Sequence, residues 1–384
     1  MKIRAITVGF NVAMPSLARK LESVGRFIAL AKTAFQDAGF DVQTTRIATQ
    51  PWAEYIPAAD KRTLRGKIQM FEDLCQNNGI DFCSIGTAYK PEETDQVADI
   101  LASTEIISCS ATIAARRTGL NHQVISAAAS AIKKVAEKSY KGEGNFRFAA
   151  IANCPPDIPF FPAGFHRGRT CFMIALEASD LVVKAFSLAH DLKSAKRELK
   201  VILGKEYRKV ENIALRIEKH GRVFFHGVDL SPAPSILPEE SIGLAFEKLG
   251  RSMFGAPGTL ATAGLITEVL RSIEVKQCGF SGLMLPVMED AVLAQRIGRL
   301  SLDALLAYSA VCGTGLDCVP LPGDTPVRVI RSMLLDIATL ALRLDKPLIA
   351  RLLPIPNGHA GSMTSIESPY LINCVIPHVT QNER

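Results

Sequence analysis

Short apolar runs alternate with amphipathic stretches through the first half of the chain. The apolar positions of residues 16–39 recur with helical spacing and stop at Gly39, a residue that commonly ends a helix. Residues 41–49 alternate polar and apolar side chains, as a half-buried strand does. The same reasoning predicts further strands at 2–11, 81–85, 105–109 and 145–152, and helices at 62–78, 92–103 and 121–139. Strands that alternate with helices favour a mostly parallel sheet covered by helices.

The second half of the chain is richer in helical patterns. Helices are expected at 180–189, 192–220, 239–249, 258–272, 289–297, 303–311 and 325–344, and strands at 170–176, 222–229 and 347–353. Linkers rich in Gly, Ser or charge do not interrupt the pattern, and internal repeats are absent from the sequence. We therefore expect residues 1–384 to form a single α/β domain.

A proline-rich segment separates the two halves. Residues 153–169 read NCPPDIPFFPAGFHRGR, and their four prolines exclude a helix or a central strand. A thiol at Cys154 and an imidazole at His166 would form a nucleophile and base if they met in space, and Asp157 and Arg169 could contact a polar substrate. The alternative is that Cys154 is a small buried residue and that His166 binds a loop carbonyl group.

A glycine-containing turn precedes the helix expected at 258–272. Gly255, Gly258 and Thr259 would expose backbone N–H groups at the helix N-terminus, where an anion can bind. The turn matches neither a Walker loop nor the dinucleotide fingerprint. The alternative is a capped helix start that binds nothing.

A second glycine turn follows the helix expected at 303–311. Cys312, Gly313, Gly315 and Asp317 lie close together there, as a site that needs close backbone approach would require. A glycine that ends the helix and an aspartate that caps the next turn explain the same residues without a site. The dipole of the helix would also disfavour a thiolate at Cys312.

Composition narrows the class of protein. The 384 residues are 48% hydrophobic with a mean hydropathy of +0.17, which suits a large buried core or a subunit interface. The net charge of +6 is dispersed, and glutamates are mixed into the most basic stretch, so nucleic acid is not expected as a partner. No apolar segment is long enough for a membrane span. The nine cysteines show no C-x-x-C, which favours reduced thiols in a cytoplasmic protein without a secretion signal.

Several segments together carry a family resemblance. They are Lys-Ile-Arg-Ala-Ile-Thr at 2–7, Ala-Asn-Cys-Pro-Pro at 152–156 with Phe-Phe-Pro-Ala-Gly-Phe-His at 160–166, and the stretches 254–260, 282–290 and 308–317. With them the chain resembles prokaryotic domain-of-unknown-function family 711, often labelled "PFL family protein". The resemblance implies a ten-stranded α/β barrel similar to that of pyruvate formate-lyase, built from half-barrels at 1–152 and 170–384. It also implies a finger loop at 153–169 inside the barrel and a homodimer.

The resemblance does not extend to glycyl radical chemistry. Radical enzymes of this type carry a C-terminal R-V-x-G-Y/F motif, and neither Gly358 nor Gly361 lies in such a context. The adjacent cysteine pair of pyruvate formate-lyase is also missing from the sequence. A shared fold does not imply a shared function.

These observations predict a non-radical enzyme, a lyase or hydrolase, that acts on a small polar or carboxylated metabolite inside the barrel. His166 would be the acid–base group, Arg169 the anion anchor, Cys154 or Cys312 the nucleophile and Asp317 the orienting carboxylate. No organic cofactor is predicted, although a bound metal ion is compatible with the residues. Two alternatives stay open, namely a non-catalytic sensor or carrier of a small molecule, and a structural homodimer with a remnant cavity.

Overall fold

Ten strands form one mixed sheet in the computed structural model, which describes residues 1–56 and 60–379. The strands are β1 (Lys2–Gly9), β2 (Val42–Ala48), β3 (Phe82–Ala88), β4 (Ile107–Ala115), β5 (Gly119–Leu120), β6 (Phe148–Ala152), β7 (Cys171–Glu177), β8 (Phe224–Ala233), β9 (Gly315–Pro322) and β10 (Leu348–Ile355). Their order is β8-β7-β1-β2-β3-β4-β6-β10-β9, and β5 pairs with β4. The α/β class predicted from the sequence and the ten strands implied by the family resemblance are confirmed.

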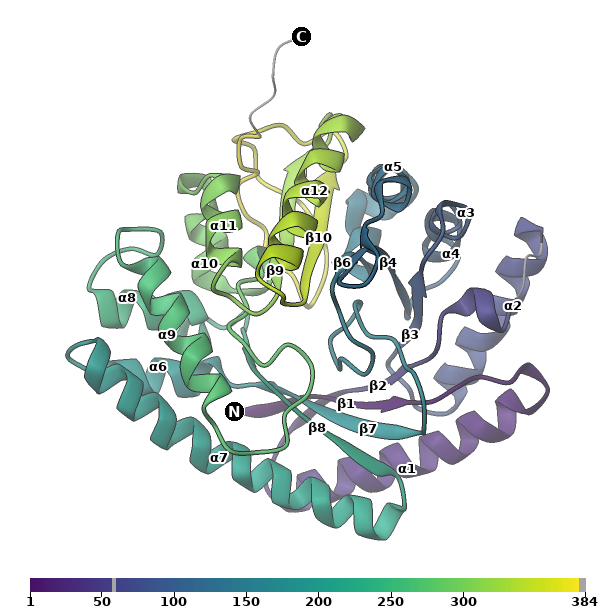
Figure 1. The fold of residues 1–384 in the computed structure, drawn as a ribbon, viewed down its shortest axis with the longest axis horizontal. Coiled ribbons are helices and arrows are strands. Elements are labelled where there is room, and N and C mark those ends of the chain that lie inside the picture. The colour runs from purple at the N-terminus through teal and green to yellow at the C-terminus, as the bar shows by residue number, and fades with distance from the viewer. Residues whose placement is uncertain (57–59, 380–384) are drawn as a thin grey trace.

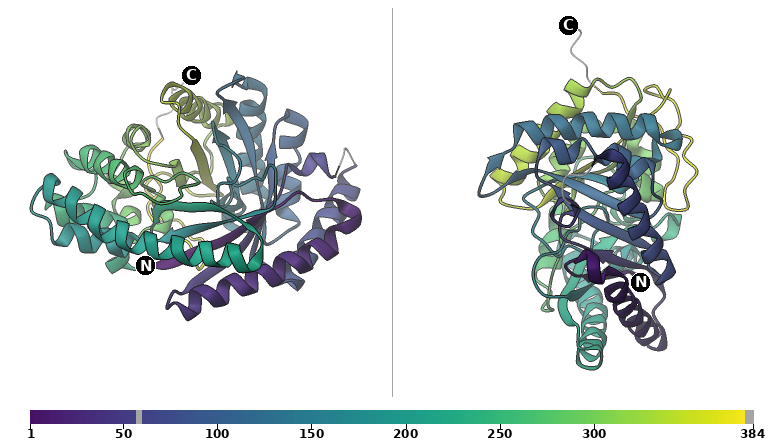
Figure 2. Two further views of the ribbon diagram at one scale, coloured as in Figure 1. Left: turned by 60° about the horizontal axis from the view of Figure 1, so that its bottom comes forward. Right: turned by 90° about the vertical axis from the view of Figure 1, so that its right-hand side faces the viewer.

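Twelve α-helices accompany the sheet in the described part of the chain. They are α1 (Leu17–Asp37), α2 (Lys61–Asn77), α3 (Pro91–Thr94), α4 (Val97–Ala102), α5 (His122–Lys138), α6 (Ser179–Ser187), α7 (Leu192–Gly221), α8 (Ile242–Gly250), α9 (Thr259–Arg271), α10 (Ala291–Arg296), α11 (Leu302–Ser309) and α12 (Val327–Arg343). Helices α1 and α7 cover β1 and β8, whereas α5 and α12 cover β4, β6 and β10 (Figures 1 and 2). None of the described helices combines the length and apolar character that crossing a bilayer requires.

The centre of the sheet is parallel and its two flanks run the opposite way. Strands β1, β2, β3, β4 and β6 pair in parallel, as the alternation of strands and helices predicted. The parallel pair β7–β8 is antiparallel to β1, and the parallel pair β9–β10 is antiparallel to β6. Within residues 1–56 and 60–379, hydrogen-bonded pairing runs from β8 to β9, and these two edge strands do not pair with each other.

Two strands were not predicted from the sequence: the short β5 and the edge strand β9. Asp317 was predicted to lie at a glycine turn, but Gly315–Pro322 is the buried edge strand β9. Proline lacks the N–H that a central strand must donate, so it is tolerated at an edge. Because of Pro320 and Pro322, the sequence of this edge strand resembles that of a turn.

The proline-rich segment 153–169 packs inside the curve of the sheet. Its apolar side chains Ile158, Ala163 and Phe165 form a cluster with Ile151 of β6, Ile349 of β10 and Ala233 of β8. The segment is anchored by the Ser84 hydroxyl, which donates to the Gly164 carbonyl, and by the His166 N–H, which donates to the Thr49 carbonyl at 2.9 Å. The loop thus bridges strands that lie far apart in the sheet order.

We predict that Gly315→Ala destabilises the fold more than Gly258→Ala. Both glycines have a left-handed backbone, with φ of 107° and 102°, so a side chain costs about 1–2 kcal/mol at each. A Cβ at Gly315 would also lie 2.5 Å from the Ile349 carbonyl oxygen of β10, whereas a Cβ at Gly258 meets nothing within 4 Å. Urea unfolding measures the difference, and equal losses for the two variants would contradict this account of β9–β10 packing.

Candidate functional site

A buried arginine and two carboxylates form an ion-pair network at the centre of the molecule, and a second arginine joins it. Arg351 of β10 donates from Nε to Asp317 Oδ1 of β9 at 2.7 Å, and from Nη2 to Glu289 Oε1 in the short 3-10 turn Val287–Glu289. The other oxygen of Glu289 binds Arg4 Nη2 of β1 at 2.9 Å. The sheet therefore brings residues from both halves of the chain into one ion-pair network.

A β-bulge aims these side chains at one another. In the β9–β10 ladder, Ala350 pairs with Leu316 and Leu352 pairs with Val319, so two residues of β9 oppose Arg351 alone. Such an extra residue re-aims side chains next to it. Asp317 and Cys318 occupy the bulge, and the Cys318 thiol donates to Glu289 Oε1 at 3.3 Å. The Arg351 guanidinium lies between Glu289 and Asp317, so it fills the place that a cation would take among these groups.

A small cavity adjoins this network beneath the proline-rich loop. Its volume is about 50 Å³, which accommodates about four water molecules. Two phenylalanines of the loop face the basic side chains: Phe160 lies 5.2 Å from the Arg351 guanidinium, and Phe161 lies 5.7 Å from that of Arg46. The charged residues that line the cavity are Arg4, Arg46, Arg351, Asp229, Glu289 and Asp317.

Asp317 lines this cavity and has one unpaired oxygen. Its Oδ2 atom is buried and has no hydrogen-bond partner among the described residues, whereas Oδ1 binds Arg351. Burial is the main cause that raises the pKa of Asp317 to about 6; the Arg351 cation opposes the rise and Glu289 adds to it. The pKa of Glu289 is instead lowered, because attraction to Arg351 and Arg4 outweighs the effect of its burial. Asp317 is therefore the carboxyl group of the network that can exchange a proton near neutral pH.

Of the three arginines that line the cavity, Arg46 of β2 is the one that pairs with no carboxylate of the described residues. Its Nε donates to Thr44 Oγ1 at 2.9 Å, and its guanidinium lies against the rings of Phe82 and Phe161. In the part of the chain that the structure describes, no carboxylate lies within 4.0 Å of it. Burial, followed by repulsion from Arg4, lowers the pKa of Arg46 to about 9, so the side chain is still a cation at neutral pH. A half-buried cation of this kind would be stabilised by an anion.

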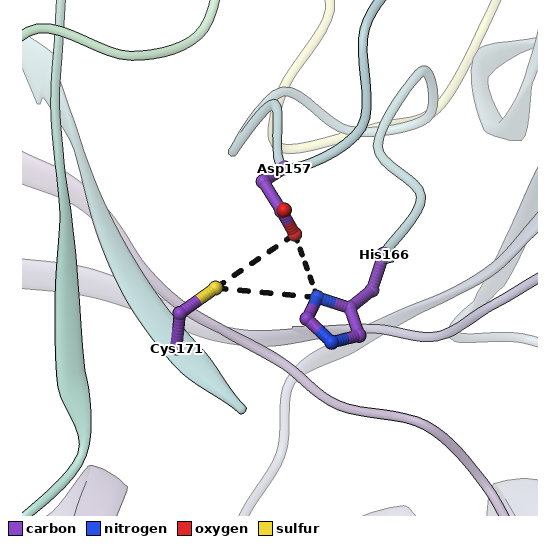
Figure 3. Close-up of side chains that lie close together, drawn as sticks. All are labelled: Asp157, His166 and Cys171. Atoms are coloured by element: carbon purple, nitrogen blue, oxygen red, sulfur yellow. Dashed lines mark hydrogen bonds and ion pairs between the residues drawn. The ribbon is translucent and has the colours of Figure 1, made fainter. Parts of the chain in front are cut away.

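A second cluster joins the two ends of the proline-rich loop. The Asp157 Oδ1 atom lies 2.6 Å from His166 Nδ1, and the Cys171 thiol at the start of β7 lies 3.7 Å from Asp157 Oδ1 and 4.0 Å from His166 Nδ1 (Figure 3). His166 Nε2 lies 3.2 Å from the Gly168 carbonyl oxygen. The cysteine next to His166 is thus Cys171 and not Cys154.

The loop residues expected to act with His166 are arranged differently. The Cys154 thiol donates to the carbonyl groups of Ala152 and Leu348 at 3.6 Å each, and its burial raises its pKa. Arg169 is exposed, and its guanidinium stacks on Phe224 at 3.3 Å. Among the described contacts, none joins Cys154 to His166, so the structure brings Asp157 and His166 together and leaves Cys154 apart.

The two glycine turns predicted from the sequence lie away from the proline-rich loop, one next to β9 and the other beside α9. Cys312 is buried, accepts from the Gly315 N–H at 3.3 Å and has a pKa raised by burial. Gly313 donates to the Leu283 carbonyl at 2.6 Å, next to β9. Gly258 and Thr259 line a separate cavity of about 230 Å³ beside α9, and Thr259 accepts a hydrogen bond from Gly255. The candidate residues therefore fall into several groups, of which only Asp317 faces the central cavity.

The two arginines of the central network, Arg4 and Arg351, were not predicted from the sequence. Arg351 is the single charge in the apolar strand Leu348–Ile355, and Arg4 occupies a similar position among apolar residues of β1. A lone charge in an otherwise buried strand needs a partner, and this signal could have identified both residues. The neighbouring carboxylates Glu289 and Asp290 have different roles. Asp290 does cap α10, by accepting from the Val292 and Leu293 N–H groups, but Glu289 belongs to the network.

We predict that Arg351→Met lowers the free energy of unfolding by about 3–5 kcal/mol, because two buried carboxyl groups lose their partner. The matched change Arg26→Met should cost less than about 1 kcal/mol, since Arg26 is 69% exposed and pairs with Glu22 on the surface. Chemical denaturation at pH 7 compares the two. A small loss in Arg351→Met would show that the network does not hold the centre together.

The sequence also identifies the family. A sequence profile of the family described as "Uncharacterised ACR (DUF711)" matches residues 1–367, so the chain belongs to this family.

Its relatives come from distant prokaryotes. A "UPF0210 protein" of Pyrobaculum arsenaticum is 28% identical over 96% of this chain and 88% of its own length. UPF0210 proteins of Methanopyrus kandleri and Neisseria gonorrhoeae are 27% and 26% identical, each over 94% of this chain and 87% and 86% of their own lengths. The similarity therefore covers the strands and loops of both candidate clusters.

Proposed function

We propose that this member of the DUF711 family is a non-radical acid–base enzyme, a lyase or hydrolase, whose substrate is a small carboxylated metabolite bound in the central cavity. One observation carries the proposal. The half-buried Arg46 cation, which contacts no described carboxylate, lines the same cavity as Asp317, whose buried Oδ2 is unpaired. An anion anchor and a titratable carboxyl group are the minimum that such chemistry needs.

Arg46 is suited to binding a carboxylate group. A guanidinium offers a planar fork of N–H donors that matches the two oxygens of a carboxylate. Its Nε already donates to Thr44, which leaves the Nη groups for a ligand. Because the cavity volume of about 50 Å³ corresponds to about four waters, the substrate would have only a few non-hydrogen atoms.

Asp317 is suited to moving the proton. With its pKa near 6, it exists in both protonation states close to neutral pH, as an efficient acid–base group must. Arg351 holds Oδ1 and thereby fixes the carboxyl plane, so that Oδ2 is the atom left to exchange a proton with a ligand. In this proposal Asp317 acts directly rather than as the orienting carboxylate.

The proposal extends to the architecture around the cavity. The flanks β7–β8 and β9–β10 run against the parallel centre, and the 153–169 loop contacts β6, β8 and β10 from within. This arrangement suits two half-barrels with a finger loop, as in pyruvate formate-lyase. The loop would then act as the roof of the cavity, with Phe160 and Phe161 next to the bound metabolite.

A carrier or sensor is the second candidate function. It is favoured because both oxygens of Glu289 are already paired, with Arg351 and Arg4. Asp317 is then the one carboxyl group of the network with a free oxygen, so the network offers a single group for proton transfer. A carrier needs the Arg46 anchor but not the Asp317 proton. Substitution of Asp317 separates the two functions: in an enzyme it should abolish turnover while binding remains, whereas a carrier should bind the ligand and show no turnover with or without Asp317.

We predict that Arg46→Gln weakens binding of a small carboxylate at least tenfold, because the amide keeps a polar group but loses the cation. Calorimetry with acetate, glyoxylate, lactate and pyruvate at low salt measures the affinity. Arg26→Gln, which removes an exposed arginine, should bind like the unaltered protein. If the unaltered protein bound none of these anions, or Arg46→Gln bound them equally well, the proposal would be wrong.

We also predict that carboxylate affinity falls as the pH rises through about 6. Below this pH Asp317 is neutral and can donate to the anion, whereas above it the ionised group repels the anion. Asp317→Asn cannot ionise, so its affinity should stay level across the same range. Titrations between pH 5 and 8 measure the slope, and a slope that survives in Asp317→Asn would assign the titration to another group.

A further inference from the structure

We infer that Asp157, His166 and Cys171 form a binding site for a divalent transition-metal ion of the zinc type. The three side chains are buried, with exposed fractions of 6%, 0% and 2%. Each offers one ligand atom, and these three atoms lie within 4.8 Å of one another. Figure 3 shows the carboxylate, the ring edge and the sulfur converging on one point.

The surroundings of His166 indicate a cation at this point. The Gly168 carbonyl oxygen lies 3.2 Å from Nε2 and the Asp157 oxygen lies 2.6 Å from Nδ1, so each ring nitrogen faces an oxygen atom. In the tautomer that carries the ring proton on Nε2, the lone pair of Nδ1 faces the carboxylate, and a metal ion would bind both atoms. Metal-bound histidines characteristically donate their other N–H to a carbonyl or carboxylate, and Gly168 offers such a carbonyl here.

The donor set suits zinc in charge and geometry. An imidazole nitrogen, a carboxylate oxygen and a thiolate sulfur are all zinc ligands, and one carboxylate with one thiolate neutralises the double charge of the ion. Tetrahedral bonds of about 2.0–2.3 Å place donor atoms about 3.4–3.6 Å apart. The sulfur distances of 3.7 and 4.0 Å are close to this spacing, so binding requires mainly that Asp157 and His166 separate from 2.6 Å. Three ligands leave a fourth position for water or a substrate group.

The position in the fold supports a built site. Gly9 ends β1, and Thr49 follows β2, at the carboxyl ends of parallel strands where α/β proteins commonly bind ligands. A Cβ at Gly9 would lie 2.5 Å from His166 Nδ1, so a larger residue would close the site. The His166 N–H donates to the Thr49 carbonyl, which fixes the backbone beneath the ring.

The ion would join the two ends of the proline-rich loop. Asp157 lies near the start of the loop, while His166 and Cys171 lie at its end, and the Asp157 N–H also donates to the Phe165 carbonyl at 2.7 Å. The segment that follows His166, residues 167–169, is exposed. The site is distinct from the Arg46 cavity and does not depend on the proposed enzyme activity.

Titration of the metal-free protein with Co²⁺ under reducing, anaerobic conditions tests the inference. We expect one equivalent of Co²⁺ to bind and to produce a thiolate-to-cobalt charge-transfer band, with Zn²⁺ displacing it. Cys171→Ser should lose that band and bind Co²⁺ at least tenfold more weakly. Cys154→Ser, which removes a cysteine of the same loop outside the cluster, should retain both.

Two results would overturn the inference. One is a folded, unaltered protein, checked by circular dichroism, that binds neither Co²⁺ nor Zn²⁺. The other is a charge-transfer band that persists in Cys171→Ser, since the sulfur ligand would then be a different cysteine. If Cys171→Ser fails to fold, the first result still overturns the inference, since it needs only the unaltered protein.

Discussion

The buried Arg351 guanidinium is the interaction on which the centre of this protein depends. Three charged groups are removed from water at this point, and each would be costly alone. They are tolerated because Arg351 binds Asp317 and Glu289 together, while Arg4 binds the second oxygen of Glu289. The network connects β1 with β9 and β10, which belong to opposite halves of the chain, so the cavity exists only when both halves have folded.

The proline-rich loop couples this network to the second cluster. Phe160 and Phe161, near the tip of the loop, cover Arg351 and Arg46, whereas Asp157 and His166 hold its two ends together. A stiff loop of this kind loses little conformational entropy when it orders, which suits a roof over a small cavity. An ion at Asp157, His166 and Cys171 would therefore also affect how readily the roof opens.

The sequence predicted elements well wherever hydrophobic spacing decides the structure. The parallel centre and the helices follow from that spacing, except that α3 and α4 were predicted as one helix at 92–103, and residues 153–169 were recognised as a loop from their prolines. Edge strand β9 was missed, because Pro320 and Pro322 are compatible with both a turn and a sheet edge.

The sites were predicted less completely, because they depend on contacts between distant residues. Asp157 and His166 lie nine positions apart and were both selected, but Cys171 follows in a strand whose apolar pattern hides it. Asp317 was selected as part of a glycine turn, but it lies in strand β9 beside Arg351. Its partner Arg351 is 34 positions further along the chain, and the bulge that joins them leaves no pattern in the sequence.

The most direct test of the central claim is a high-resolution crystal structure of the protein grown with glyoxylate at pH 6. The account predicts a carboxylate bound to the Nη atoms of Arg46, within hydrogen-bond distance of Asp317 Oδ2 and beneath Phe160 and Phe161. A glyoxylate ordered at another site, with only water beside Arg46, would contradict it.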